Sequence, residues 1–507
     1  MGIPSYYKKL IDRFPALVKK GVRAESPLKS DRLYMDFNCL IYHCLKGLPP
    51  YASAEKEAWE LALLDAVKKY TVHVWEVAGR PPKVFLGVDG VVPMAKIRQQ
   101  RLRRFKSVWL ASKEREVGAR VGESWDSNAI TPGTAFMEAL GSALRDLCVK
   151  RGWTVSDASE PGEGEQKLIA AIRRDGAGRI AVYGLDADLI VLSLLALAEK
   201  PEIEGWQLLR EGGEFGAKDA FATLDVKELL KIMAQPGMDP VEFMREYICA
   251  MSFLGNDFLP HSLTVKIRDG GHDMLRKELT RIHQKGLRLV VNGLVQWRAA
   301  ADLISGWVER EEEMLVSAIE HKYKMRPMVP RTDAERLMSG VQNLPVEWKE
   351  DLCILQEGVL IEGWRDIYCR RWLKGAGAKQ VCGEYMKGLQ WIVDYYTGKP
   401  VSFSWYFPWN VAPLWSDLST ELLSAESTAP VAANMPAPVA PQEQLAMVLP
   451  LASWGLVRDS RLRSLPGRAP AFWPQTFSFF SAGRRWMWEC EPEIPVMSVE
   501  RMRLACM

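Results

Sequence analysis

The segment Arg179-Ile180-Ala181-Val182-Tyr183-Gly184-Leu185-Asp186-Ala187-Asp188 indicates the fold of this chain. An apolar run of strand length ends at a glycine and is followed closely by two aspartates. A short apolar run bounded by turn residues is typical of a strand buried on both faces. The segment therefore predicts a core strand with carboxylates at its carboxyl end.

The chain up to about residue 270 repeats this pattern, because short apolar runs alternate with amphipathic stretches. Predicted strands are residues 32–36, 83–89, 153–156 and 179–184. Helix-like stretches between them are residues 54–78, 93–107, 134–151 and 164–174. Such alternation is typical of an α/β fold, and it predicts a mainly parallel central sheet flanked by helices.

The remainder of the chain has a different pattern, which predicts a mostly helical second region packed on the sheet. We place the α/β core at residues 1–275 and the helical, aromatic-rich region at residues 276–423. Residues 424–444 are rich in Ala and Pro without apolar periodicity, which predicts a linker or loop. Residues 445–507 form a C-terminal segment that we expect to pack on the core.

The composition excludes several classes of protein. Lys and Arg total 66 against 63 Asp and Glu, and a net charge of +3 excludes a histone-like or polyanionic protein. No apolar run reaches the roughly 20 residues of a membrane helix, and the N-terminus lacks a signal-peptide pattern. Nine scattered cysteines argue against a disulfide scaffold or a structural zinc. We expect a monomer without a membrane segment, in the cytoplasm in preference to the nucleus.

Seven acidic residues fall where a parallel sheet would bring them together. Three lie at or just after strand ends with a fourth beside them, two lie in a glycine-flanked turn, and one follows an apolar helix: Asp36, Asp89, Asp186, Asp188, Glu163, Glu165 and Asp257. The carboxyl ends of parallel strands open on one edge of the sheet, so we expect these side chains to line one crevice. Taken singly, an aspartate at a strand end is commonly a turn former or a helix N-cap.

So many carboxylates in one crevice repel one another unless protons or cations neutralise them. Hard oxygen ligands in this number suit Mg²⁺, for which Mn²⁺ can substitute. Two such ions a few Å apart stabilise the attacking and leaving oxygens of an in-line attack on a phosphodiester. The cluster therefore predicts a two-metal phosphoryl hydrolase.

A basic stretch follows Asp89 in the sequence. Six of the eleven residues from Lys96 to Lys106 are basic and none is acidic. Helical periodicity places four polar residues on one face near the acidic crevice: Lys96, Gln100, Arg103 and Arg104. Three cations and an amide on one face suit a terminal phosphate, so we expect these residues to bind one. The competing interpretation is a solvated basic surface helix.

Aromatic side chains can serve as platforms on which unpaired bases stack. Tyr42 and His43 follow Asp36 closely, and Trp391 and Trp405 lie in the aromatic-rich second region. We predict that Tyr42, His43 and one of the two tryptophans, Trp391 or Trp405, stack on bases, whereas the alternative for the tryptophans is an ordinary place in the core.

The order of these motifs resembles the Xrn family of 5′→3′ exoribonucleases, within the flap-endonuclease-like superfamily of PIN-type nucleases. In the first region the resemblance is carried by Met1-Gly2-Ile3-Pro4, Tyr34-Met35-Asp36-Phe37-Asn38, the basic stretch, Gly184-Leu185-Asp186-Ala187-Asp188 and Gly255-Asn256-Asp257-Phe258. In the second region it is carried by Gly388-Leu389-Gln390-Trp391, Tyr395-Tyr396 and Ser404-Trp405-Tyr406-Phe407-Pro408. The chain resembles a short member that lacks the long C-terminal domains.

The resemblance implies a specific activity. The seven acidic residues would hold two Mg²⁺ ions, and the four residues of the basic stretch would bind the 5′-monophosphate of single-stranded RNA. The family degrades such RNA processively and releases nucleoside 5′-monophosphates. In one departure, the family usually carries a histidine six residues after the first aspartate, where this chain has Tyr42 followed by His43.

Two alternatives remain open. A structure-specific, flap-type DNA nuclease would use the same acids on branched duplexes, but the basic stretch and the aromatic second region argue against it. A catalytically silent RNA-binding scaffold would keep the fold without turnover. The retention of all seven carboxylates argues against a scaffold, because their mutual repulsion lowers stability.

Overall fold

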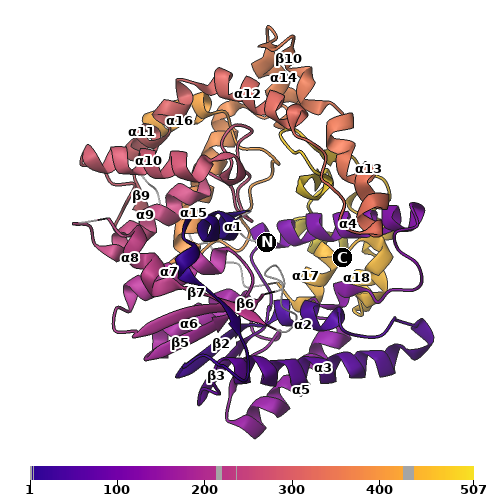
Figure 1. Ribbon diagram of the computed structural model, residues 1–507. Coiled ribbons are helices and arrows are strands. Elements are labelled where there is room, and N and C mark those ends of the chain that lie inside the picture. The colour runs from indigo at the N-terminus through magenta and orange to yellow at the C-terminus, as the bar shows by residue number, and fades with distance from the viewer. Residues whose placement is uncertain (1–2, 4, 213–219, 236, 426–438, 507) are drawn as a thin grey trace.

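The computed structural model describes residues 3, 5–212, 220–235, 237–425 and 439–506. A seven-stranded sheet lies in the lower part of Figure 1, and the helical second half of the chain lies above it. The strand order is β1-β7-β6-β5-β2-β3-β4. The strands are β1 (Val18–Val22), β2 (Arg32–Asp36), β3 (Lys83–Gly87), β4 (Thr154–Ser156), β5 (Arg179–Tyr183), β6 (Gly205–Glu211) and β7 (Phe221–Asp225).

The sheet is mainly parallel, which confirms the predicted fold class. Strands β6, β5, β2, β3 and β4 run parallel to one another, whereas β7 is antiparallel to β6 and β1 is antiparallel to β7. The four predicted strands are present, but β1, β6 and β7 were not predicted. In β1 three consecutive residues, Lys19 to Gly21, are exposed, so that edge strand lacks the apolar run that marks a core strand.

Helices cover both faces of the sheet, and each face has its own apolar core. The helices of the first half are α1 (Tyr6–Arg13), α2 (Asn38–Leu45), α3 (Lys56–Val77), α4 (Met94–Glu116), α5 (Ala135–Arg151), α6 (Gly164–Asp175), α7 (Asp188–Glu199), α8 (Val226–Met233) and α9 (Pro240–Ser252). One core lies between the sheet and α2, α3 and α5, and the other includes α6, α7 and α9. The buried faces are rich in Leu, Ile and Val, whose burial drives this packing.

The second half is helical, with two small hairpin sheets inserted. Its helices are α10 (Gly271–Gln284), α11 (Trp297–Val308), α12 (Glu311–Lys324), α13 (Asp333–Glu347), α14 (Trp364–Trp372), α15 (Ala378–Tyr396) and α16 (Trp415–Ser424). The two-stranded sheets pair β8 (Val290–Val291) with β9 (Leu294–Val295), and β10 (Leu355–Gln356) with β11 (Val359–Leu360). Among the described residues, no helix is long and apolar enough to span a bilayer.

The C-terminal segment contains four short helices and one small sheet. These are α17 (Pro441–Val448), α18 (Ser460–Arg463), α19 (Leu465–Arg468), α20 (Val499–Cys506), β12 (Phe479–Phe480) and β13 (Glu491–Pro492). Most of the predicted linker, residues 424–444, lies outside the described residues, but its first residue ends α16 and its last four residues begin α17. These five residues are helical and do not form a loop. Pro441 suits the first turn of a helix, and Glu443 accepts a hydrogen bond from the backbone N–H of Ala440.

Helix α4 joins the sheet to the C-terminal segment. It runs across the middle of Figure 1, above α17, and the two helices share an apolar cluster that includes Leu102 and Leu445. The buried guanidinium of Arg101 donates hydrogen bonds to the carbonyl oxygens of Met447, Phe472 and Pro495. A solvated surface helix is therefore excluded, because α4 is buried along much of its length.

We expect the substitution Arg101→Met to destabilise the protein by roughly 3–5 kcal/mol, because it removes three charge-assisted hydrogen bonds to buried carbonyl groups. Urea unfolding measures this change, and limited proteolysis should show cleavage first within residues 445–506. Arg115→Met on the exposed face of the same helix is the matched control. Equal stability of the two variants would contradict this account of how the segment is held.

Candidate active site

A pocket of about 140 Å³ opens at the carboxyl ends of β2, β3 and β5. Six of the seven predicted acidic residues line it: Asp36, Asp89, Glu163, Glu165, Asp186 and Asp257. The seventh, Asp188, has a carboxylate oxygen within 4.8 Å of those of Glu165 and Asp186. The structure therefore brings all seven carboxylates together, as the parallel sheet predicts.

Close backbone packing between α6 and β3 assembles part of this cluster. A side chain at Gly164 would place its Cβ 2.6 Å from the carbonyl oxygen of Gly87 and 2.7 Å from Oδ1 of Asp36. Only a glycine permits this approach, which begins α6 against the end of the strand. Glu163 and Glu165 flank the glycine, so the same contact brings both carboxylates beside Asp36.

The carboxylate of Asp89 is held in place by two hydrogen bonds, one from a backbone N–H and one from a side-chain amide. Its Oδ1 accepts a hydrogen bond of 2.7 Å from the backbone N–H of Gly164, and its Oδ2 accepts one of 2.9 Å from Nδ2 of Asn38. The backbone N–H of Asp89 in turn donates to Oδ1 of Asn38 at 3.2 Å. Asn38 was not predicted as a site residue, although it lies two residues beyond Asp36. It orients a carboxylate without adding charge.

Burial and like charge together disfavour ionisation of the cluster. Burial, followed by repulsion from neighbouring aspartates, raises the pKa of Asp36 and Glu165 well above the ordinary range. The same causes raise the pKa of Asp188 to about 7. Among the described residues, Oε2 of Glu165 and Oδ1 of Asp188 are buried without a hydrogen-bond partner. Unpaired carboxylate oxygens that repel one another fit divalent cations, which would bind them as hard oxygen ligands.

Lys96 supplies a protein cation to one side of the cluster. Its Nζ lies 2.5 Å from Oε2 of Glu163 and 2.8 Å from Oδ2 of Asp257. Burial lowers the pKa of Lys96, but Asp257 and Glu163 outweigh it and raise the pKa well above its usual value. Burial would raise the pKa of Asp257, yet the attraction of Lys96 lowers it. Lys96 thus lines the pocket where predicted, with its ammonium turned toward carboxylates.

The other three residues of the predicted phosphate site line the same pocket from α4. They are Gln100, Arg103 and Arg104. Nη1 of Arg104 donates to Oδ1 of Asn128 at 2.8 Å, and burial lowers the pKa of Arg104 to about 10. Its Nε is buried without a partner among the described residues, as is Oε1 of Gln100. A partly desolvated guanidinium with a free donor is a receptor for an anion.

The predicted base-stacking residues differ in their positions. Tyr42 lines the pocket and is 39% exposed. His43 does not belong to the described lining of this pocket, because its ring stacks on Tyr70 at 4.4 Å between centroids and lies near Glu211.

Trp391 and Trp405 are buried, at 1% and 9% exposed, so neither presents a free ring face in this structure, and their role in base stacking stays a prediction. Neither belongs to the described lining of the pocket. The indole N–H of Trp391 donates to the carbonyl of Ser402, and that of Trp405 donates to Glu384. Trp391 instead packs against Phe258, the residue after Asp257, and so supports the site from beneath.

A residue from the second region reaches the acidic cluster directly. The hydroxyl of Tyr395 on α15 donates a hydrogen bond of 2.6 Å to Oε1 of Glu163. Tyr395 also stacks on Trp391, with 4.8 Å between ring centroids. The Tyr395-Tyr396 pair contributed to the resemblance, but no signal in the sequence alone placed it at the site. The second region therefore helps to hold the carboxylates.

We expect Gly164→Ala to lower stability by about 1–3 kcal/mol, since the added Cβ overlaps the Gly87 carbonyl and must move α6 away from β3. The same shift should reduce the increase in melting temperature that Mg²⁺ produces. Thermal unfolding with and without Mg²⁺ measures both effects. Gly383→Ala in α15 is the control, because its Cβ would lie in open space. A Gly164→Ala protein with wild-type stability and Mg²⁺ response would refute the packing argument.

In protein freed of divalent ions by EDTA, the raised pKa values of the cluster make stability depend on pH. A carboxyl whose folded pKa is raised stabilises the fold below its unfolded pKa, near 4, and this contribution is lost as the pH rises through the folded value. Because the folded pKa of Asp188 is about 7, the stability that this carboxyl contributes is lost as the pH rises from near 4 to about 7. We therefore expect the melting temperature of the metal-free protein to fall across this interval, and Asp188→Asn to reduce the fall by roughly 2 °C.

The matched control is Asp146→Asn, which removes an exposed carboxylate from α5. It should melt like the wild type at every pH. Differential scanning fluorimetry then also compares the Mg²⁺ response, which should be smaller for Asp188→Asn than for Asp146→Asn. An identical pH profile for wild type and Asp188→Asn would contradict the repulsion inferred from the geometry.

Comparison with known proteins identifies two regions of one family. Residues 1–211 match the family described as "XRN 5'-3' exonuclease N-terminus", and residues 361–506 match the "Xrn1 helical domain". The chain is 32% identical to 5'-3' exoribonuclease 2 of Debaryomyces hansenii over 62% of this chain and 39% of that protein. It is 26% identical to 5'-3' exoribonuclease 2 of Arabidopsis thaliana over 99% of this chain and 66% of that protein.

The chain thus spans about two fifths to two thirds of the length of these relatives. Among solved structures, the catalytic core of Rad2 in complex with a DNA substrate shows a TM-score of 0.34 and 14% identity, over 81% of this chain and 92% of that one. A likeness of that size carries no functional argument. The two Xrn regions match in order and together cover well over half of the chain, so the protein belongs to the Xrn family of 5′→3′ exonucleases.

Proposed function

We propose that this chain is a 5′→3′ exoribonuclease that removes nucleotides one at a time from single-stranded RNA carrying a 5′-monophosphate. The observation that carries the proposal is the shared pocket, which is lined by six carboxylates, with Asp188 beside two of them, and by Gln100, Arg103 and Arg104. The names of the relatives support the same reaction class.

The carboxylates would hold two Mg²⁺ ions, for which the unpaired oxygens of Glu165 and Asp188 supply ligands. When bound, such ions lower the pKa of an attacking water and stabilise the leaving oxygen of a phosphodiester. Asn38 and the backbone of Gly164 keep Asp89 oriented for this task, and Tyr395 does the same for Glu163. Without metal ions, the ammonium of Lys96 pairs with Glu163 and Asp257 and neutralises part of the cluster. Once bound cations share those carboxylates, the same ammonium would be available to a phosphate.

The α4 side of the pocket would select the 5′ end. Arg104, with its free Nε, and Arg103 would donate hydrogen bonds to a terminal phosphate, and Gln100 would add a neutral contact. In this proposal a terminal phosphate bound to these groups would occupy much of the pocket of about 140 Å³, so a triphosphate or a cap would be excluded by size. Tyr42, half-exposed at the same pocket, would stack on the first base. Release of mononucleotides would be processive if the shortened RNA moves into the pocket by one nucleotide after each cleavage and does not dissociate from the protein.

The direct test incubates the protein and Mg²⁺ with one RNA sequence carrying a 5′-monophosphate, a 5′-triphosphate or a 5′-hydroxyl. We expect rapid loss of the monophosphate form alone, mononucleotide products, and no cleavage by Asp186→Asn. Equal cleavage of all three ends would refute the phosphate selection, and cleavage of branched DNA in preference to RNA would favour the flap-type nuclease. Tight RNA binding without cleavage would favour the scaffold.

We expect Arg104→Gln to lower kcat/KM for the monophosphorylated RNA by roughly 10–100-fold, the effect of losing a charged hydrogen bond to phosphate. Its residual activity on the 5′-hydroxyl RNA should equal that of the wild type, because no phosphate is present to recognise. Steady-state kinetics on the two RNAs measure this difference. A proportional loss on both substrates would mean that Arg104 serves the fold and does not select the end.

A further inference from the structure

A second cavity, of about 190 Å³, lies on the neighbouring face of α4. Four parts of the chain line it: α1's N-cap Ser5, α4, residues 254–268 and residues 484–492. Its lining contains six cationic side chains against three carboxylates. The cations are Arg98, Arg103, Lys106, Lys266, Arg268 and Arg484, and we call this space the rear cavity.

Most of these cations have no carboxylate partner. Within the described part of the chain, Arg98, Lys106, Lys266 and Arg484 form no ion pair, whereas Arg268 pairs with Glu489. Lys106 donates to the carbonyl oxygens of Trp488 and Cys490, and Lys266 donates to that of Gly483. Neutral acceptors hold these groups in place, and Glu491 in the lining attracts Arg98 and Lys106 without pairing with either, so the rear cavity keeps an excess of positive charge that suits an anion.

Burial makes this arrangement costly for the free protein. Arg484 is 6% exposed, and its Nε has no hydrogen-bond partner among the described residues. Burial and the nearby Arg484 lower the pKa of Lys266 to about 8, and burial also lowers that of Lys106. An anion in the cavity would relieve this repulsion and satisfy the free donor.

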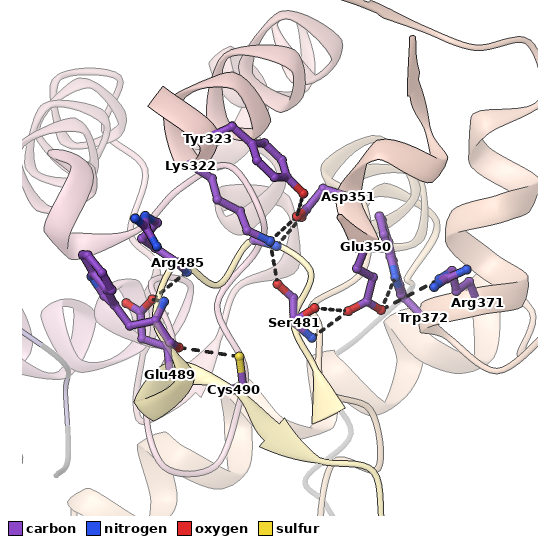
Figure 2. A network of polar contacts seen from close by, with 12 residues as sticks. Lys322, Tyr323, Glu350, Asp351, Arg371, Trp372, Ser481, Arg485, Glu489 and Cys490 are labelled. Atoms are coloured by element: carbon purple, nitrogen blue, oxygen red, sulfur yellow. Dashed lines mark hydrogen bonds and ion pairs between the residues drawn. The ribbon is translucent and has the colours of Figure 1, made fainter. Parts of the chain in front are cut away.

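The loop that carries Arg484 is firmly anchored. Figure 2 shows Lys322 between Asp351 and Ser481, and Glu350 accepting hydrogen bonds from the backbone N–H and hydroxyl of Ser481. Lys322 and Asp351 form a buried ion pair, and Asp351 also accepts from the backbone N–H of Gly483. Ser481 and Gly483 before Arg484 are therefore held in place, and after it the backbone N–H of Arg485 donates to Glu489, so the chain is anchored on both sides of this guanidinium.

The rear cavity adjoins the proposed active site. Arg103 and Asp257 line both spaces, so one guanidinium borders the phosphate site and the rear cavity. Tyr42, by contrast, lines the acidic pocket and is absent from the described lining of the rear cavity. The two spaces therefore share a boundary at Arg103 and Asp257, and Lys106, Arg484 and Trp488 line only the rear cavity.

One aromatic side chain completes the rear cavity. Trp488 lines it and is 43% exposed, which leaves an indole face free. A base can stack on such a face, and this contact contributes about 1–3 kcal/mol. Buried Arg484 together with the half-exposed ring of Trp488 matches a nucleotide better than it matches inorganic phosphate.

We propose that the rear cavity binds the nucleoside 5′-monophosphate product, with its phosphate on Lys106 and Arg484 and its base on Trp488. This inference rests on the proposed function, since that reaction supplies the ligand. It gives the product an exit separate from the side occupied by the RNA, which remains in place for the next cleavage.

The test measures equilibrium binding of adenosine 5′-monophosphate and of inorganic phosphate, in EDTA so that no cleavage occurs. We expect Lys106→Gln to weaken both ligands at least fivefold, and Trp488→Ala to weaken only the nucleotide. The controls are Arg115→Gln on α4 and Trp348→Ala, which replaces another exposed tryptophan that does not line the cavity. Unchanged nucleotide affinity in both cavity variants would overturn the proposal.

Crystals of the unaltered protein soaked with 5-iodouridine 5′-monophosphate give an answer that does not depend on variants. Iodine anomalous density beside Trp488 supports the proposal, and density only in the first pocket overturns it. Displacement of adenosine 5′-monophosphate by a 5′-hydroxyl RNA, or phosphate binding as tight as the nucleotide, also overturns the product assignment. The RNA cleavage assay is read separately: its failure would remove the proposed function even if the nucleotide binds.

Discussion

Repulsion among buried carboxylates is the constraint on which the rest of this structure depends. The parallel sheet and the N-terminus of α6 gather seven of them in one cluster, six of which line the same pocket, and burial raises the pKa of several. The surrounding elements respond with Lys96 from α4, Asn38 from α2 and Tyr395 from α15, each bonded to a carboxylate. These contacts hold the cluster without saturating it, because oxygens of Glu165 and Asp188 stay unpaired among the described residues.

Helix α4 connects the separate parts of the molecule through its different faces. One face carries Gln100 and Arg104 to the acidic pocket, and another binds the C-terminal segment through Arg101. A third face, with Arg98 and Lys106, borders the rear cavity. A basic helix usually lies in solvent, but here buried cations meet acceptors: Lys96 meets carboxylates, and Arg101 and Lys106 meet backbone carbonyl oxygens.

Particular residues show how far the sequence could be interpreted. The strands that end near Asp36, Asp89 and Asp186 were predictable, since a buried parallel strand is a short apolar run bounded by turn residues. β1 was missed because an edge strand exposed to solvent carries no such run. The burial of Trp391 and Trp405 was not foreseen, because the sequence shows an aromatic ring but not its burial; Trp391 packs on Phe258, and Trp405 packs on Trp391. Tyr395 was not assigned because its contact with Glu163 spans distant segments of the chain.

The sequence by itself determined the α/β class, the acidic cluster and the basic helix beside it, because strand direction and helical period follow from local pattern. Only the tertiary structure decided which aromatic ring stays exposed at the pocket, that Lys96 faces carboxylates, and that Arg484 lies behind α4. Those positions depend on packing between segments separated by hundreds of residues. Local pattern cannot determine such packing, because it results from filling space around the whole core.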